Sequence, residues 1–345
     1  MNVLLTSVGR RGYLVEYFRE ALHGQGQVIC ANSGKDAPAM SEGDRNLVVP
    51  WSCEAAYAET IFRICREYKV GLVTSLHDLD IYVLSQHAAT FRSMGVIPVF
   101  PSAEWGRISL DKLECGKVLS SHGFDVPQTY LSHSTLRLAL EEERIRFPIV
   151  VKARMGFGSL GLQECHSWEE IQCASILGER NVGQLHERWR LETPIGSRLV
   201  FQEKVCGPEY CLALVNDLEG KYVTHFVTHV LAKHMGESEV AVTVDPVIVG
   251  DIPGRLSSVI GQPGICGVDC IVANGTLTII DVNVRFTGDY PFQHIAGANV
   301  PAAAIAWAQG KSADDSWFRS RVAVRGYKKI VPSPAEKARE RIPIQ

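Results

Sequence analysis

The sequence lacks the features of a secreted, membrane or nucleic-acid-binding protein. No run reaches the roughly 18 apolar residues of a transmembrane helix, and no basic segment with an apolar stretch behind it opens the chain, so we expect no signal peptide. The net charge of −3 provides no attraction to nucleic acid or membrane. The ten cysteines form no Cys-x-x-Cys pair. We therefore expect small buried thiols in a reducing cytoplasm, without a nucleic-acid or membrane partner.

Two nucleotide-binding fingerprints are also missing. The turn Gly9-Arg10-Arg11-Gly12 lacks the full dinucleotide pattern, and the glycines after Lys152 lack the Gly-Lys-Ser/Thr of a Walker A loop. Backbone N–H groups at the start of the following helix, together with Arg10 and Arg11, would suit a carboxylate or phosphate. Two solvated arginines beside a tight turn explain the same residues equally well.

The 345 residues suffice for two or three domains. Strands and helices alternate up to about residue 105, which predicts a doubly wound α/β domain. Ligands bind at the carboxyl ends of strands in such sheets. Asp78 and Asp80 directly follow the strand predicted at 70–74, so they are candidate substrate contacts, with helix capping as the alternative. The expected strands are 3–8, 27–32, 46–50, 70–74 and 96–100, with helices at 13–22 and 53–68.

The pattern beyond residue 109 predicts isolated helices and antiparallel hairpins. Asn274-Gly275 separates two apolar runs and is typical of a tight hairpin turn. Residues 311–345 are polar and contain prolines, so we expect a loosely packed tail. The expected helices are 109–122, 134–145, 251–260 and 296–309, and the expected strands are 147–152, 199–205, 209–215, 222–231, 267–272 and 277–286.

Polar residues alternate at the end of the strand predicted at 277–286. Asp281, Asn283 and Arg285 share one face of this strand, and Asp269 is expected to lie opposite them across the hairpin. Carboxylate and amide oxygens suit hard metal ions, and a guanidinium suits phosphate. A polar strand face wetted by solvent is the alternative.

Two chain interruptions add to this pattern. Lys152 leads into a loop with three glycines and a serine, 156–161, whose N–H groups can wrap phosphate oxygens. The Gly207-Pro208 step breaks a strand and leaves main-chain groups free beside Val205, which suits a flat heteroaromatic ring.

Together these motifs resemble the ATP-grasp superfamily of carboxylate–amine ligases, in the branch related to the carbamoyl phosphate synthase large subunit and amino-acid ligases. The likeness extends to about residue 310. It implies a Rossmann-like pre-ATP-grasp domain at 1–108, followed by an ATP-grasp fold of two α+β subdomains at 109–200 and 201–310, with a tail at 311–345.

The resemblance also implies site residues. Mg²⁺, with Mn²⁺ as an alternative, would be held by Asp269, Asp281 and Asn283, and the catalytic groups would be Arg285, Lys152 and Asn283. Substrate contacts are expected at Arg10, Arg11, Asp78 and Lys233. ATP would contact Lys112, Lys152, Gly158, Ser159, Gln202, Glu203, Val205 and Glu209.

The implied reaction couples a small carboxylate, an amino acid or peptide, to an amine through an acyl phosphate, with release of ADP. A bicarbonate-using enzyme and a non-catalytic ATP-binding protein are the alternatives, and a homodimer stays open. The absence of a second ATP-grasp copy argues against the bicarbonate user. Asp281, Val284 and Ala153 stand where the family usually has Glu, Pro and Pro. The shorter aspartate must approach a metal more closely, or accept only one of two ions.

Overall fold

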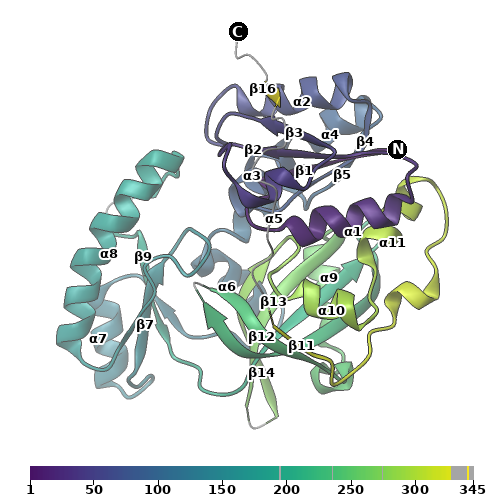
Figure 1. Cartoon of the computed structure of the whole chain (residues 1–345). Helices are drawn as coiled ribbons and strands as arrows, with labels where there is room; N and C mark the ends of the chain where they lie inside the picture. The colour runs from purple at the N-terminus through teal and green to yellow at the C-terminus, as the bar shows by residue number, and fades with distance from the viewer. Residues whose placement is uncertain (194–195, 235, 274, 328–339, 342–345) are drawn as a thin grey trace.

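The computed structural model describes residues 1–193, 196–234, 236–273, 275–327 and 340–341. Its strands form a six-stranded sheet near the N-terminus, a four-stranded sheet, and a second six-stranded sheet. In Figure 1 the four-stranded sheet and its helices stand to one side of the other two sheets. This arrangement confirms the predicted fold class, an α/β domain followed by two α+β units.

The N-terminal sheet is parallel and has the strand order β16-β3-β2-β1-β4-β5. Side chains alternate across it: Val3 and Leu5 of β1 pack beneath α1, whereas Leu4 packs with α2 on the other face. The predicted boundaries agree to within a few residues. The elements are β1 (Asn2–Thr6), α1 (Gly12–Leu22), β2 (Val28–Asn32), β3 (Arg45–Val48), α2 (Tyr57–Glu67), β4 (Val70–Ser75), α3 (Asp78–Leu84), α4 (Ala88–Ser93), β5 (Ile97–Val99) and α5 (Ala103–Ile108).

The four-stranded sheet has the order β6-β9-β7-β8 and forms the central unit. Its longest helix, α8, is absent from the sequence prediction, although Ser167 and Glu170 carry a capping-box spacing and the Ser167 hydroxyl accepts from the Glu170 N–H. β9 pairs with β7, so this sheet continues to Glu203, past the expected boundary at 200. The elements are α6 (Lys112–Ser121), β6 (Thr129–Tyr130), α7 (His133–Glu141), β7 (Ile149–Ala153), β8 (Gln163–Cys165), α8 (Trp168–Trp189) and β9 (Leu199–Glu203).

The last sheet is antiparallel, with the order β14-β13-β10-β11-β12-β15. The described residues 311–327 are mostly exposed, as expected of a loosely packed tail, but β15 pairs with β12 and β16 pairs with β3 of the N-terminal sheet, so strand pairing attaches the tail at two places. The Thr243 hydroxyl also donates to the Arg321 carbonyl at 2.5 Å. The elements are β10 (Glu209–Asn216), β11 (Tyr222–His234), β12 (Glu237–Val244), α9 (Ile252–Ile260), β13 (Gly264–Ala273), β14 (Thr276–Asn283), α10 (Tyr290–Ala296), α11 (Val300–Ala308), β15 (Arg325–Tyr327) and β16 (Glu340–Arg341).

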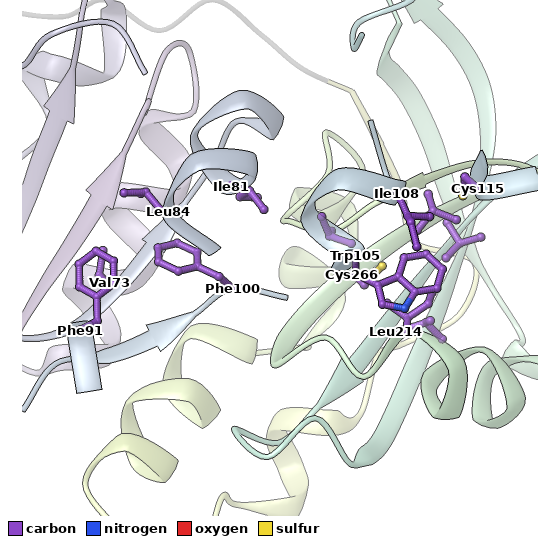
Figure 2. Packing of buried hydrophobic residues seen from close by; sticks show 14 of the residues in the cluster. Val73, Ile81, Leu84, Phe91, Phe100, Trp105, Ile108, Cys115, Leu214 and Cys266 are labelled. Carbon is purple, nitrogen blue, oxygen red and sulfur yellow. The ribbon is translucent and has the colours of Figure 1, made fainter. Parts of the chain in front are cut away.

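The first and last sheets share their hydrophobic cores, to which α6 contributes Cys115 and Leu119, whereas the four-stranded sheet has a core of its own. One cluster runs from Val73 in β4 to Leu214 in β10, and Figure 2 follows it across the junction. Trp105 lies at this junction and donates its indole N–H to the Val259 carbonyl at 2.9 Å. The central core gathers around Val151 and Phe201. The N-terminal and C-terminal units are therefore packed as one body, and the central unit is joined to it around a cavity.

None of the helices within the described ranges has both the length and the apolar character needed to cross a bilayer.

Candidate functional site

A cavity of about 480 Å³ lies where the three units meet. Its walls are unusually rich in charge of both signs, as expected for a site that handles anionic groups and metal ions. It gathers most of the residues singled out in the sequence. The lining includes Arg10, Arg11, Asp78, Lys112, Lys152, Gly158, Ser159, Glu209, Lys233, Asp269, Asp281, Asn283 and Arg285.

The expected pairing of acidic residues across the hairpin is present. Asp269 of β13 lies directly opposite Asp281 of β14, so both carboxylates stand on the same face of the sheet. The Asn283 amide nitrogen lies 3.3 Å from Asp269 Oδ2. Burial raises the pKa of Asp269 to about 7, and the carboxylates of Asp289, Asp281 and Glu209 act in the same direction.

A lysine ammonium contacts this acidic pair. Lys112 Nζ lies 3.1 Å from Asp281 Oδ1, and its position is fixed by the start of α6. There Asp111 caps the helix through the Leu113 N–H, and its two carboxylate oxygens also accept from Nε and Nη2 of the Arg154 guanidinium at 2.8–3.0 Å. The cap and the ion pair thus hold α6 against the end of β7.

Lys152, at the end of β7, is a buried lysine that borders the cavity. Within the described residues, no carboxylate forms an ion pair with it. Burial, reinforced by the neighbouring Lys112 ammonium, lowers the pKa of Lys152 to about 8. A cation in this setting is stabilised by an incoming anion.

Arg285 is locked by a carboxylate from another unit. Its Nε and Nη2 donate to Asp78 at 2.8–3.0 Å, and both side chains are about nine-tenths buried. Arg285 Nη2 also donates to Asn283 Oδ1 at 3.1 Å. His77, not Asp78, caps α3 through the Leu79 N–H. Asp78 therefore lines the cavity as the partner that positions Arg285, and the capping alternative is wrong. Asp80 is buried under the Tyr57 hydroxyl, 2.5 Å away.

The remaining candidate charges are also paired. Arg10 and Arg11 lie 3.7 and 3.3 Å from Glu237, and Arg11 donates to the Leu76 carbonyl as well. Glu209 forms an ion pair with Lys233. From the sequence we expected Glu209 to contact ATP and Lys233 to contact the substrate, but in this structure the two side chains are paired with each other. The two-arginine turn is not simply solvated either, because Arg11 is largely buried.

The glycine loop is folded over the cavity. Phe157 packs edge-on against His77 of the N-terminal unit, with ring centroids 4.3 Å apart, and in a tilted arrangement against Trp189 of α8 at 4.9 Å. Gly236, in the β11–β12 turn, lets the loop approach closely, because a Cβ there would lie 2.7 Å from Ser159 Oγ. Gly158 and Ser159 thus lie between the central sheet and the last one.

The expected hinge residues occupy the crossing from β9 to β10. Gln202 donates to the Thr129 hydroxyl at 2.8 Å and borders a small hollow of about 20 Å³ beside Lys112 and Asp281. Glu203 and Val205 are half-buried and border neither cavity. An adenine pocket at this hinge stays a prediction.

Sequence reasoning missed three residues at this site. All three line the cavity: Glu237 at the start of β12, His77 directly before Asp78, and Asp289 four residues after Arg285. Each contacts groups distant in the sequence, so no local spacing indicates it. The Thr287-Gly288-Asp289 step directly after Phe286 was the one available signal for Asp289.

Comparison with known families agrees with this geometry. Residues 109–289 match the ATP-grasp domain model, and residues 3–99 match the PylC-like N-terminal domain model. The chain belongs to the ATP-grasp family. For an ATP-grasp protein, family membership implies ATP and Mg²⁺ as ligands.

Individual relatives are distant. The D-alanine–D-alanine ligase of Corynebacterium aurimucosum is 26% identical over 196 residues, and the match spans 53% of each chain, about half the length of that relative. The L-amino acid ligase of Bacillus licheniformis superposes with a TM-score of 0.71 at 17% identity, over 96% of this chain and 81% of that one.

A third relative was solved with nucleotide. The biotin carboxylase domain dimer of Hydrogenobacter thermophilus 2-oxoglutarate carboxylase, in complex with MgADP, ADP and bicarbonate, has a TM-score of 0.70 at 14% identity. The match covers 90% of this chain and 70% of that one. At such identities the two solved structures establish the shared ATP-grasp fold alone.

Proposed function

We propose that this ligase joins a small carboxylate, an amino acid or a peptide, to an amine through an acyl phosphate and releases ADP and phosphate. The observation that carries the proposal is Lys152. Among the described cavity-lining residues it is the one lysine or arginine without a carboxylate partner, and it lies beside the glycine loop. A buried ammonium of this kind calls for an anion, and the phosphates of ATP supply one.

The facing carboxylates fit a divalent metal in their chemistry. Asp269, Asp281 and Asn283 offer hard oxygen ligands, which Mg²⁺ and Mn²⁺ prefer. The Lys112 ammonium that contacts Asp281 supports this assignment, because it occupies a place where positive charge is needed. An ion bound there would neutralise the phosphate oxygens.

The residues of the chain would act mainly through position and charge. A substrate carboxylate oxygen attacks the γ-phosphorus while the bond to the β–γ bridging oxygen breaks and ADP leaves. Lys152 and Arg285 would stabilise the negative charge that gathers on the phosphoryl oxygens. Asp78 would keep the Arg285 guanidinium in register for this contact. We assign no general base.

The glycine loop would protect the intermediate. Its contacts through Phe157 and Gly236 close it over the cavity, and water would otherwise hydrolyse an acyl phosphate. The amine then attacks the acyl carbon, the carbon–oxygen bond to phosphate breaks, and the amine proton passes to solvent. The products are an amide and phosphate.

Hydroxylamine trapping tests this proposal. The protein is incubated with Mg²⁺-ATP and a panel of amino acids and dipeptides, without an amine acceptor. We expect ADP and an acid-dependent hydroxamate. Turnover with bicarbonate alone would indicate the carboxyphosphate alternative, and ATP binding without any turnover would indicate a non-catalytic protein. Full turnover with an acid that never yields a hydroxamate would exclude the acyl phosphate.

A further inference from the structure

Asp289 borders the cavity but has no part in the reaction as proposed. Asp289 is only 6% exposed, its Oδ1 atom has no hydrogen-bond partner among the described residues, and the neighbouring Cys211 thiol is at most a weak donor to the carboxylate. Burial of a carboxylate oxygen without a partner is costly. Such a group in a native protein therefore calls for a ligand.

Helix capping does not account for this carboxylate. Asp289 precedes α10 at the N-cap position, where aspartate ordinarily accepts a hydrogen bond from the first turn. Here the side chain makes no capping hydrogen bond, and the backbone carbonyl of Asp289 accepts from the Phe292 N–H instead. The carboxylate therefore borders the cavity without capping the helix.

The surroundings of Asp289 provide further acceptors. One ligand atom each from Asp289, Asp269 and Cys211 lie within 4.8 Å of one another. A tetrahedral ammonium with N–O distances of about 2.8 Å would place its acceptors about 4.6 Å apart. The neighbouring Lys233 ammonium forms its ion pair with Glu209 rather than with Asp289. The two carboxylates and the separation of at most 4.8 Å are compatible with a small cation beside Asp289, bound next to the proposed metal ligand Asp269.

We propose that Asp289 binds an ammonium group carried by the acid substrate, so that the activated carboxylate belongs to an amino acid or another amine-bearing acid. The substrate class rests on the proposed ligase function, since it assumes that a carboxylate is activated in this cavity. Bicarbonate has no cationic group to match Asp289.

The attacking amine does not fit the same position. An amine must be deprotonated to attack an acyl phosphate, whereas a buried carboxylate raises the pKa of an adjacent ammonium and keeps it protonated. A group held at Asp289 is therefore unreactive and serves to orient the molecule. This makes Asp289 a specificity-determining residue for the acid substrate.

The test compares amino acids with their des-amino analogues, which keep the same side chain and carboxylate. The variant is Asp289→Asn, which removes charge at constant size, with Asp289→Glu as the charge-retaining companion. Asp251→Asn is the matched control, because Asp251 also lies at a helix N-cap without a side-chain hydrogen bond but is exposed. The readouts are hydroxamate formation, the KM for ATP, and calorimetric binding of the acid with Mg²⁺-ADP present.

We expect wild-type protein to favour the amino acid by at least tenfold in kcat/KM, or in affinity. Asp289→Asn should lose about ten- to a hundredfold with amino acids, as expected for a charged contact. Des-amino acids and the KM for ATP should change less than about threefold. Asp289→Glu should retain part of the preference, and Asp251→Asn should match wild type.

Several outcomes would overturn this assignment. If Asp289→Asn lowers kcat/KM equally for amino acids and des-amino acids, or lowers neither, Asp289 does not bind an ammonium group. The proposed ligase function would be unaffected by that result. A second outcome is that calorimetry shows tighter binding of amino acids than of des-amino acids, that Asp289→Asn abolishes this difference, and that no acid yields a hydroxamate. This result would retain the ammonium site and reject the ligase chemistry. A divalent ion retained by nucleotide-free wild type and lost from Asp289→Asn would make Asp289 a metal ligand and contradict the proposal.

Discussion

Two cation–carboxylate pairs line the same cavity, and they differ in almost every respect. Arg285 and Asp78 share several donor–acceptor contacts of 2.8–3.0 Å, and both side chains are about one-tenth exposed. Lys112 lies 3.1 and 3.3 Å from the two Asp281 oxygens, and although the Lys112 side chain is only 12% exposed, the Asp281 side chain is 30% exposed. The first pair is a buried fork, and the second is an open contact between compact charges.

The difference indicates that the two ion pairs have different roles, one fixed and one exchangeable. A bidentate guanidinium fixed by its partner keeps one geometry, which suits a group that must be preorganised. An ammonium on a partly exposed carboxylate can be exchanged, so Lys112 can turn to phosphate when a metal ion occupies Asp281. We therefore interpret Arg285–Asp78 as a permanent link between the N-terminal and C-terminal units, and Lys112–Asp281 as an exchangeable one.

Breaking the permanent pair should have the largest effect on stability. Asp78→Asn leaves the Arg285 guanidinium buried without its counter-charge, which costs about 3–5 kcal/mol in comparable buried pairs. Urea unfolding should report this loss. The control Asp245→Asn alters an exposed aspartate at a helix start and should cost about 1 kcal/mol. A loss below about 1 kcal/mol for Asp78→Asn would show that the buried fork does not link the units.

Breaking the exchangeable pair should act on turnover instead. Asp281→Asn keeps the size of the side chain but removes a proposed metal ligand, so Mg²⁺-dependent ATP turnover should fall by at least about a hundredfold. Unfolding should be affected less than by Asp78→Asn, because the Asp281 carboxylate is 30% exposed and the Lys112 ammonium borders the cavity. Steady-state ADP release and urea titration of the same preparation measure both. Near-normal turnover would remove Asp281 from the metal site.

The unpaired Lys152 should give the smallest effect, a dependence of nucleotide affinity on pH. Because its pKa is lowered to about 8, free protein loses this charge as the pH rises, whereas bound phosphates favour the charged form. The Kd for ADP should rise about tenfold from pH 7 to pH 9. The Kd is measured by calorimetry with a metal chelator present, so that titration of Asp269 linked to metal binding does not contribute to the profile. The arginine of Lys152→Arg stays charged over this pH range, so the variant should show little dependence of the Kd for ADP on pH. An unchanged pH dependence in that variant would show that another group causes it.

The sequence sufficed for the parts that depend on local pattern. Alternation along β14 predicted that Asp281 and Asn283 share a face, and the hairpin turn predicted Asp269 opposite them. The pairing of Asp78 with Arg285 could not be predicted in this way, because 207 positions separate the two residues and only the docking of two units joins them. The same holds for Glu237 with Arg11. Helix α8 was missed although its capping box was readable, since its apolar positions follow no strong helical period.

The tail and the unit boundary illustrate a second limit. A polar composition predicts exposure, but β15 is attached to β12 chiefly by backbone hydrogen bonds, which composition does not reveal. Similarly, β9 and β10 follow one another in the chain yet join different sheets, so the boundary depends on pairing partners rather than on the Gly207-Pro208 break alone.

Transfer of an oxygen label tests the acyl phosphate most directly. An acid that supports turnover is labelled with ¹⁸O in both carboxylate oxygens and supplied with Mg²⁺-ATP and an amine. If the carboxylate attacks the γ-phosphorus, each phosphate released carries one ¹⁸O atom from the acid, and the nucleotide product is ADP. Unlabelled phosphate in amounts matching amide formation, or AMP with pyrophosphate, would contradict the account.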